Sequence, residues 1–331
     1  DDKDRAYFGY YAQFAHQQNM LQDAVRTSAY FHALAMNGDR LAGRRVMDLG
    51  AGSGILSYFA VRQGAAHVWA VEASGMARQI QRMTATDAPS PSPSPSSPST
   101  APNAWLAGRI TVVNALIERW VPPSPDFRVD VLISEPIGVL VLHERMCESF
   151  LVARDRFLAP GGAMIPNAST IRLAPFTDAP LWTQTAAKLA FWQARDFYGI
   201  DLAPLAPHAM DEVFEQPVVG CFDPRILMAA PCSHVIDFTT ITLEAIRDIT
   251  IPVEYTMQYT GILHGLAGWF DVDLAGVTLS TAPAEPKTHW QQIRFLLKEP
   301  LAVNMGQRLV GWVRLTANAL RSYDVALDLL V

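Results

Sequence analysis

Apolar and polar positions follow one pattern up to about residue 158 and another after it. In the first part, short apolar runs are followed by glycine-containing loops and helical runs, beginning with the strand that leads into Asp48. This alternation of strand and helix predicts a doubly wound α/β sheet. Residues 129–133, which are largely apolar, have the composition of a strand that is buried on both faces of a parallel sheet.

The second part alternates with a period of two residues, as β-strands do when one face is buried. It begins after Pro160, Gly161 and Gly162, and no further glycine-rich helix start follows. This pattern predicts an antiparallel barrel or sandwich. The strands that it predicts are residues 250–258, 291–297, 308–316 and 323–331.

Two segments of the first part stand outside the strand and helix alternation. Residues 17–36 are expected to form one helix, with Gly38 near its end. Residues 87–103 include the run PSPSPSSPST, which cannot bury a core, so we expect a disordered insertion before a strand that begins near Ile110. Phosphorylation is one use for such an insertion, although a tolerated loop is the simpler interpretation.

Composition restricts the class of protein. The 331 residues suit two domains, and a hydrophobic content of 50% supplies a large core. The formal net charge of −6 argues against direct nucleic-acid binding and is compatible with basic protein substrates.

No apolar stretch reaches the roughly 20 residues that cross a bilayer, so no membrane span is expected. Cys147, Cys221 and Cys232 are few and scattered, which predicts a reducing compartment and no metal site. Since the chain starts at Asp1 without Met, we expect a trimmed fragment, and no targeting segment is recognised.

A glycine-rich loop indicates a nucleotide-type cofactor. Residues 45–57 read RVMDLGAGSGILS, an apolar strand followed by three alternating glycines and an apolar helical run. Glycine allows close approach of backbone to ligand, and the helix start presents free N–H groups. The next strand ends at Glu72, roughly 20 residues beyond the glycines, where an acid accepts hydrogen bonds from ribose hydroxyls. Together they indicate an adenosine-bearing ligand; the alternative is a tight turn and a solvated glutamate.

Glu135 and Glu144 are the most informative pair of residues for the chemistry. Glu135 follows the buried strand at its carboxyl end, where open α/β sheets build their sites. Glu144 is expected at the start of a second helix, and Pro136 and Gly138 allow the chain to bend back. Two facing carboxylates suit a guanidinium, which presents a planar fork of donors. By spacing alone, it is equally plausible that the two side chains never meet.

Several ordered motifs resemble the protein arginine methyltransferase family, most closely its coactivator-associated branch. They extend over nearly the whole chain, and in combination they are far more specific than any single motif. The motifs are QQNMLQDAVRT (17–27), DLGAGSGILS (48–57), AVEAS (70–74), SEPIG (134–138), HERM (143–146), PVV (217–219), WFDV (269–272), LSTAP (279–283) and THW (288–290).

The resemblance implies a Rossmann-like methyltransferase sheet preceded by a helical lid and followed by an antiparallel β-barrel domain. The expected domains are a lid over 1–38, a cofactor domain over 39–162 and a barrel domain over 163–331. The barrel domain is expected to carry a helical dimerisation arm near 189–210, because residues 189–205 resemble that arm. Its aromatic side chains need a partner surface, which implies a head-to-tail homodimer.

The cofactor implied by the resemblance is S-adenosylmethionine. Arg26 would bind its methionine carboxylate, and Gln17 would close over it. Glu72 would accept the ribose hydroxyls, and Glu118 would accept the adenine amino group. The remaining residues expected at the cofactor are Gly50 and Gly52, which allow it to lie against backbone, and Ser149 at the adenine end.

The resemblance also assigns residues to the substrate. Glu135 and Glu144 would clamp the arginine, and either glutamate, or Asp23 with His289, could relay the proton that leaves. Asp23 is placed on one helix face with Met20 and Arg26 by its spacing. The expected substrate pocket contains Tyr11, Met20, Ile137 and Trp290.

Two positions depart from the family pattern. Ile137 and Val139 stand where the family usually has Met and Tyr, which puts turnover or the degree of methylation in question.

The expected activity is that of a type I arginine N-methyltransferase, which makes monomethyl and asymmetric dimethyl arginine. The alternatives are a monomethylating enzyme, a cofactor-binding scaffold with little turnover, a nicotinamide oxidoreductase, and a methyltransferase for RNA or small molecules. By resemblance, histones and RNA-associated proteins are the expected substrates, and the nucleus and cytoplasm the expected locations.

Overall fold

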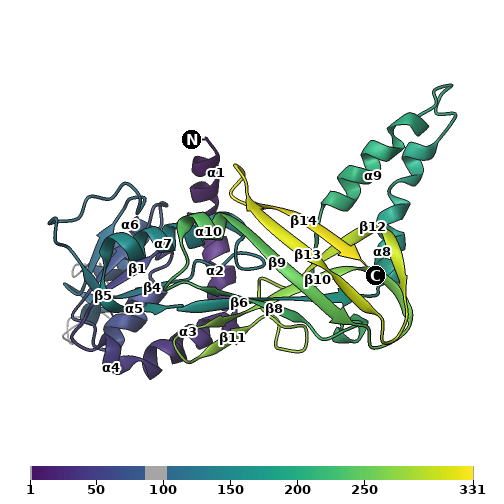
Figure 1. Ribbon diagram of the computed structural model, residues 1–331. Helices are drawn as coiled ribbons and strands as arrows, with labels where there is room; N and C mark the ends of the chain where they lie inside the picture. The colour runs from purple at the N-terminus through teal and green to yellow at the C-terminus, as the bar shows by residue number, and fades with distance from the viewer. Residues whose placement is uncertain (1, 86–102, 331) are drawn as a thin grey trace, which may run out of the picture.

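The structure is a computed structural model that describes residues 2–85 and 103–330, with side chains from Tyr7 onward. Figure 1 shows a helix-flanked parallel sheet at one end, antiparallel sheets at the other, and a pair of helices that projects from the antiparallel part. The insertion expected over 87–103 lies outside the described residues, except for Asn103.

The parallel sheet confirms the predicted α/β class. Its five strands lie in the order β3-β2-β1-β4-β5, and every neighbouring pair is parallel. The strand order reverses between β1 and β4, so the carboxyl ends of these strands flank the crevice where such sheets bind ligands. The strands are β1 (Arg45–Leu49), β2 (His67–Val71), β3 (Ile110–Val113), β4 (Val129–Ser134) and β5 (Leu158–Ile165), with the helices α4 (Gly38–Leu41), α5 (Ile55–Arg62), α6 (Ala77–Thr84) and α7 (Met146–Phe157).

The amino-terminal segment differs from the prediction of one helix over residues 17–36. The chain forms α1 (Asp2–Tyr11), α2 (Phe14–Gln22) and α3 (Ala24–Met36), with a break at Asp23. Asp23 has an extended conformation, and its Oδ1 accepts a hydrogen bond from the Arg26 amide at 3.0 Å. Aspartate is a strong N-cap because it satisfies an amide that the new helix leaves free. The prediction of one continuous face carrying Met20, Asp23 and Arg26 is therefore wrong.

Two antiparallel sheets form the second part, as the alternating pattern predicts. The larger has the order β7-β12-β10-β6-β8, with β11 paired to β10, and the smaller has the order β14-β13-β9. Strict alternation of buried and exposed residues along β9 shows one face on the core. The strands are β6 (Ala168–Phe176), β7 (Val218–Val219), β8 (Cys232–Asp237), β9 (Asp248–Thr256), β10 (Gly261–Asp273), β11 (Thr278–Ser280), β12 (Ile293–Val303), β13 (Arg308–Ala317) and β14 (Tyr323–Leu330).

The parallel and antiparallel parts share one continuous hydrophobic core. A partly buried polar contact joins them as well. Glu148 on α7 accepts hydrogen bonds from Arg145 and from Arg247, at the end of α10 (Leu243–Arg247). Burial opposes ionisation of Glu148, but the two arginines outweigh it and lower the pKa of this carboxyl. The two parts are thus fixed relative to each other, which allows both to contribute to one site.

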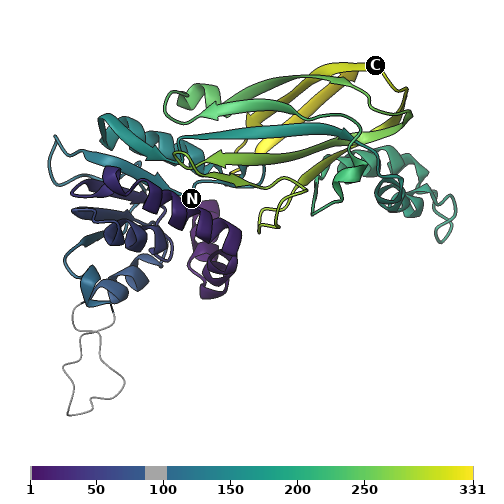
Figure 2. The same ribbon diagram turned by 90° about the horizontal axis from the view of Figure 1, so that it is seen from below.

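The arm is made by α8 (Ala179–Ala187) and α9 (Ala206–Glu215), which project from the antiparallel sheets (Figure 1). Residues 189–205, which the resemblance places on the arm, form its tip and are mostly irregular. Only two short 3-10 turns occur there, η3 (Ala190–Gln193) and η4 (Ala203–Leu205). The tip exposes large apolar side chains, with Tyr198 at 92% and Ile200 at 59%. Figure 2 shows the arm at the opposite end of the molecule from the parallel sheet.

Membrane insertion through a helix finds no support in the structure. Across the described ranges, none of the helices combines the length and the apolar character that a bilayer crossing requires.

Candidate active site

A cavity of about 470 Å³ opens where the amino-terminal helices, the parallel sheet and the antiparallel part meet. This volume lies in the range of small-molecule sites. Nearly all the residues expected at the site line it, and Asp23, the exception, lies behind His289. The expected residues that line the cavity are Tyr11, Gln17, Met20, Arg26, Gly50, Gly52, Glu72, Glu118, Glu135, Ile137, Glu144, Ser149, His289 and Trp290.

The glycine loop and Glu72 form one hydrogen-bonded unit. Gly52 has a φ of 52°, and its amide donates to Glu72 Oε2 at 2.7 Å. The Ser74 amide donates to Oε1 at the same distance, so the carboxylate is fixed at the end of β2. A Cβ atom at position 52 would lie 2.9 Å from Oε1 of Gln17. Gln17 of α2 therefore lies directly across the loop, and a side chain at position 52 would displace its amide group.

Glu118 and Ser149 lie together at another part of the cavity wall. Ser149, on α7, donates from its hydroxyl to Glu118 Oε1 at 2.6 Å. Arg156 donates to the Glu118 carbonyl at 3.0 Å, which fixes the backbone of this loop. The two residues expected at an adenine ring are thus neighbours, although they are distant in sequence.

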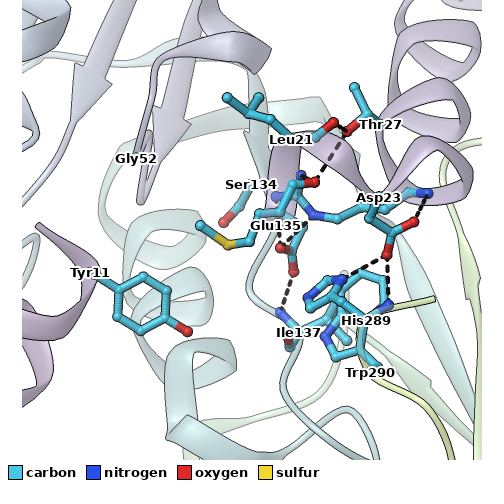
Figure 3. Close-up of polar contacts among 12 residues, drawn as sticks. Tyr11, Leu21, Asp23, Thr27, Gly52, Ser134, Glu135, Ile137, His289 and Trp290 are labelled. Atoms are coloured by element: carbon cyan, nitrogen blue, oxygen red, sulfur yellow. Dashed lines mark hydrogen bonds and ion pairs between the residues drawn. The ribbon is translucent and has the colours of Figure 1, made fainter. Parts of the chain in front are cut away.

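Glu135 lies at the carboxyl end of β4 and is bound by Arg26 of α3. Its Oε2 accepts from Arg26 Nε at 3.0 Å and from Nη2 at 2.9 Å, while Oε1 accepts from the Ile137 amide at 3.1 Å. Figure 3 shows this carboxylate and its contact with Ile137. Both side chains of the pair are less than a tenth exposed. Burial raises the pKa of Glu135, and the positive charge of Arg26 opposes that shift.

Glu144 is brought to the same cavity by a sharp bend rather than by a helix start. It lies in the 3-10 turn η2 (His143–Arg145) with a φ of 72°, so it directly precedes the predicted helix, α7, which begins at Met146. The bend depends on Gly138, where a Cβ atom would lie 2.0 Å from the His143 carbonyl oxygen. Without a side chain there, residues 138 and 143 approach closely, and Glu144 turns back toward the end of β4.

Two phenols of the amino-terminal helix orient Glu144. Tyr7 donates to Glu144 Oε2 at 2.9 Å, and Tyr11 donates to the same oxygen at 2.5 Å. Burial, and then the charge of Glu144, raise the pKa of Tyr7; burial and the neighbouring Tyr7 and Glu144 raise that of Tyr11. Both phenols therefore remain protonated donors. Oε1 of Glu144 accepts no hydrogen bond from the described part of the chain.

Asp23, His289 and Trp290 support the Glu135 side of the cavity (Figure 3). Asp23 Oδ2 lies 2.8 Å from His289 Nδ1 and accepts from the His289 amide at the same distance. Burial opposes ionisation of Asp23, but hydrogen bonds from His289 and from the Arg26 amide lower its pKa. Trp290 Nε1 donates to the Ile137 carbonyl at 2.8 Å. The loop that follows Glu135 is thus fixed from the antiparallel part.

Sequence reasoning missed two arginines that line the cavity, Arg119 and Arg321. Arg321 lies in the turn between β13 and β14, lines the cavity, and places its guanidinium over the rings of Tyr7 and Phe8. No motif or spacing signals it, because it comes from the far end of the chain.

The arrangement suits a cationic group with several donors beside a nucleotide-like ligand. Two carboxylates on one bend face the cavity, and each is held by separate partners. A planar guanidinium could bind between them through charge-assisted hydrogen bonds. The glycine loop, Glu72 and Glu118 line the rest of the cavity, where an adenosine-bearing molecule has complementary partners.

Comparison with known protein families identifies both parts of the chain as methyltransferase-like. The family described as the arginine methyltransferase oligomerization subdomain matches residues 168–331. A second family, ribosomal protein L11 methyltransferase, matches residues 26–87.

Curated relatives match nearly all of the chain. The protein named "Probable histone-arginine methyltransferase CARM1" of Oryza sativa subsp. indica is 46% identical over 329 residues, which is 98% of this chain and 59% of that protein. "Histone-arginine methyltransferase CARMER" of Anopheles gambiae is 43% identical over 333 residues, which is 99% of this chain and 50% of that protein. The chain thus spans between half and three-fifths of the length of these relatives.

Solved structures agree with the sequence relatives. Protein arginine methyltransferase 10 of Arabidopsis thaliana has a TM-score of 0.83 at 27% identity and covers 98% of this chain and 94% of that one. The Trypanosoma brucei PRMT1 enzyme–prozyme complex with AdoHcy has a TM-score of 0.81 at 26% identity, over 96% of this chain and 94% of that one. Fold, motif order and sequence identity therefore agree, and the chain belongs to the protein arginine methyltransferase family.

Proposed function

We propose that this protein transfers methyl groups from S-adenosylmethionine to the guanidino nitrogens of arginine in proteins, with histones among its substrates. The observation that carries this proposal is the meeting of Glu135 and Glu144 in the cavity that also contains the glycine loop and Glu72. Relatives named histone-arginine methyltransferases support the choice of substrate. Since histones are nuclear proteins, we place the activity in the nucleus.

The residues present fit the proposed cofactor, which supplies the methyl group. Glu72 is fixed by two amides and would accept both ribose hydroxyls. Glu118 and Ser149 would take the adenine ring. Gly50 and Gly52 would lie against the cofactor, and Gln17 with Tyr11, joined by a hydrogen bond, would cover it. Arg26 would bind the methionine carboxylate while remaining in contact with Glu135.

The proposed role of the two glutamates is to hold the substrate arginine and to shift its charge. A free guanidinium is a poor nucleophile because its charge is delocalised and its pKa is above about 12. Carboxylates on both sides orient one terminal nitrogen toward the methyl group and draw positive charge toward the other. Positioning and electrostatic preorganisation supply the rate enhancement. The released proton would leave through either glutamate or through His289 and Asp23, which are in hydrogen-bonding contact.

The first experiment is mass spectrometry of an arginine-rich histone-tail peptide incubated with the protein and S-adenosylmethionine. We expect a gain of two methyl groups, with loss of dimethylamine in the fragments, which identifies asymmetric dimethyl arginine and a type I enzyme. A product with one methyl group points to Ile137 and Val139, which border the cavity where the family usually has Met and Tyr. The variant Ile137→Met with Val139→Tyr should then add the second methyl group.

The absence of any methylated product would contradict the proposal in favour of a cofactor-binding scaffold, provided that S-adenosylhomocysteine still binds in a calorimetric titration. If S-adenosylhomocysteine does not bind but NAD does, the oxidoreductase interpretation is correct. The peptide in which the arginine is replaced by lysine is the matched control, because it keeps the charge but lacks the planar fork of donors.

We also propose that the protein forms a homodimer through the arm. The tip of the arm leaves the large apolar side chains of Phe191, Tyr198 and Ile200 exposed. The family match to an oligomerization subdomain over 168–331 includes this arm.

The double variant Tyr198→Ser and Ile200→Ser is expected to sediment as a monomer rather than as a dimer at micromolar protein concentration. Val235→Ser, an exposed residue on β8, is the matched control, and a dimer that persists in the double variant would contradict the role of the arm.

A further inference from the structure

The turn between β13 and β14 contacts the Glu144 bend on both sides of Glu144. Ser322 Oγ lies 2.8 Å from His143 Nδ1. Arg145 Nη1 donates to the Asn318 carbonyl at 2.6 Å. The turn is itself braced, since Oδ1 of Asn318 accepts from the amides of Leu320 and Ser322. A rigid turn from the antiparallel part therefore rests on the two neighbours of a proposed substrate-binding carboxylate.

The same turn contacts the amino-terminal helix through Arg321. Its guanidinium carbon lies 4.6 Å from the centre of the Tyr7 ring and 5.4 Å from that of Phe8. These distances are within the range of cation–π attraction. Arg321 has a backbone φ of 55°, which residues other than glycine rarely adopt. This conformation indicates that surrounding contacts fix the residue. Figure 1 shows the tip of this hairpin beside α1.

Tyr7 connects the two sets of contacts. It receives Arg321 on its ring face and donates its hydroxyl to Glu144 Oε2 at 2.9 Å. Burial is the main cause that raises the pKa of Tyr7, and the negative charge of Glu144 raises it further. The positive charge of Arg321 lowers this pKa. A shift of the Tyr7 ring would remove one of the two phenol donors that orient Glu144. The position of the ring therefore matters to the carboxylate as well as to the helix.

We propose that Arg321 is a positioning residue, which fixes α1 against the β13–β14 turn through Tyr7 and Phe8 and so orients Glu144 for the substrate arginine. The effect of Arg321 on catalysis rests on the proposed function. Its effect on the position of α1 does not, because these contacts are present without substrate.

The test compares Arg321→Met, which keeps the length but removes the charge, with Arg321→Lys, which keeps a cation. Leu320→Ala is the matched control, because this neighbouring side chain in the same turn is 68% exposed. Amide hydrogen exchange of residues 7–11 is measured on the protein without ligand. Loss of a cation–π contact predicts roughly 3- to 30-fold faster exchange there in Arg321→Met. Residues of β1 and β4 should exchange as in the unchanged protein.

The kinetic measurement separates a positioning role from a general loss of structure. Arg321→Met is expected to lower kcat/KM for the arginine peptide by a similar factor, roughly 3- to 30-fold. Affinity for S-adenosylhomocysteine should change less, because the contacts at Glu72, Glu118 and Ser149 are kept. Arg321→Lys should recover at least part of both effects, and Leu320→Ala should behave as the unchanged protein.

Three results would overturn the inference. One is unchanged exchange of residues 7–11 in Arg321→Met. Another is equal acceleration throughout the parallel sheet, which would indicate a loss of fold rather than of one contact. The third is a lysine variant that behaves as the methionine variant does, since the cation would then be irrelevant. Should the unchanged protein methylate nothing, the proposed function fails, and the exchange measurement still decides whether Arg321 fixes α1.

Discussion

Replacing Glu144 by Gln is expected to reduce kcat/KM for an arginine peptide by about 100-fold or more. The variant keeps the size of the side chain, and its amide oxygen can still accept hydrogen bonds from Tyr7 and Tyr11. It loses the negative charge that would attract the guanidinium and stabilise positive charge as the methyl group is transferred. The effect should therefore appear in catalysis and leave the fold unchanged. Steady-state kinetics with a histone-tail peptide measure it.

Glu254→Gln provides the matched control, because it makes the same chemical change on an exposed residue of β9, away from the cavity. Calorimetric titration with S-adenosylhomocysteine and thermal unfolding should give nearly the same values for Glu144→Gln and for the unchanged protein. Activity of Glu144→Gln within a few-fold of the unchanged protein would mean that this carboxylate does not hold the substrate.

Replacing Arg26 by Met is expected to affect both stability and cofactor binding. The change leaves the buried Glu135 carboxylate without its ion-pair partner, which costs about 3–5 kcal/mol in free energy of unfolding at neutral pH. If Arg26 also binds the methionine carboxylate, the affinity for S-adenosylhomocysteine should fall by roughly tenfold or more, as for loss of a charged hydrogen bond. Urea unfolding and calorimetric titration measure the two effects.

The loss of stability in Arg26→Met should depend on pH. Burial already raises the pKa of Glu135, and removing Arg26 removes the main opposing charge, so its pKa in the folded state rises further. A carboxyl with a raised folded-state pKa favours the folded state below its unfolded pKa, about 4.3, and that contribution is lost as pH rises through the folded pKa. The difference from the unchanged protein should therefore be small near pH 4.5 and largest at neutral pH and above.

Adding Glu135→Gln to Arg26→Met supplies the internal control. Because the double variant has no buried carboxylate to ionise, it should regain part of the stability, and its remaining deficit should no longer vary with pH. Arg308→Met, on an exposed ion pair of β13, is the matched single change and should cost at most about 1 kcal/mol. An equal loss of stability for Arg26→Met at all pH values would contradict the pairing with Glu135.

Local sequence patterns determined many of the strands of this protein. Apolar runs predicted the buried parallel strands, and alternation predicted the four antiparallel strands β9, β12, β13 and β14, although their ends differ by a few residues. The glycine loop with Glu72 also has a local signature, because the turn needs positive φ and the acid follows on the next strand. These features depend on residues that are close in sequence, so one sequence is enough to predict them.

Where the prediction of an element failed, a tertiary contact competed with the local pattern. Asp23 ends one helix and begins another because its carboxylate caps α3 and also binds His289, which is 266 positions away. Periodicity alone continues the helix through this point. Glu144 adopts a left-handed conformation because residues 138 and 143 approach each other, which no helix propensity describes.

The composition of the site was decided by the tertiary structure. Glutamates 135 and 144 are suggestive in the sequence, but only the fold shows that Arg26 binds one and that Tyr7 and Tyr11 bind the other. Arg321 has no local signature at all, since it joins the cavity through a turn at the far end of the chain. Such long-range contacts arise because distant elements pack on one continuous core, and neither residue spacing nor composition records which side chains that packing brings together.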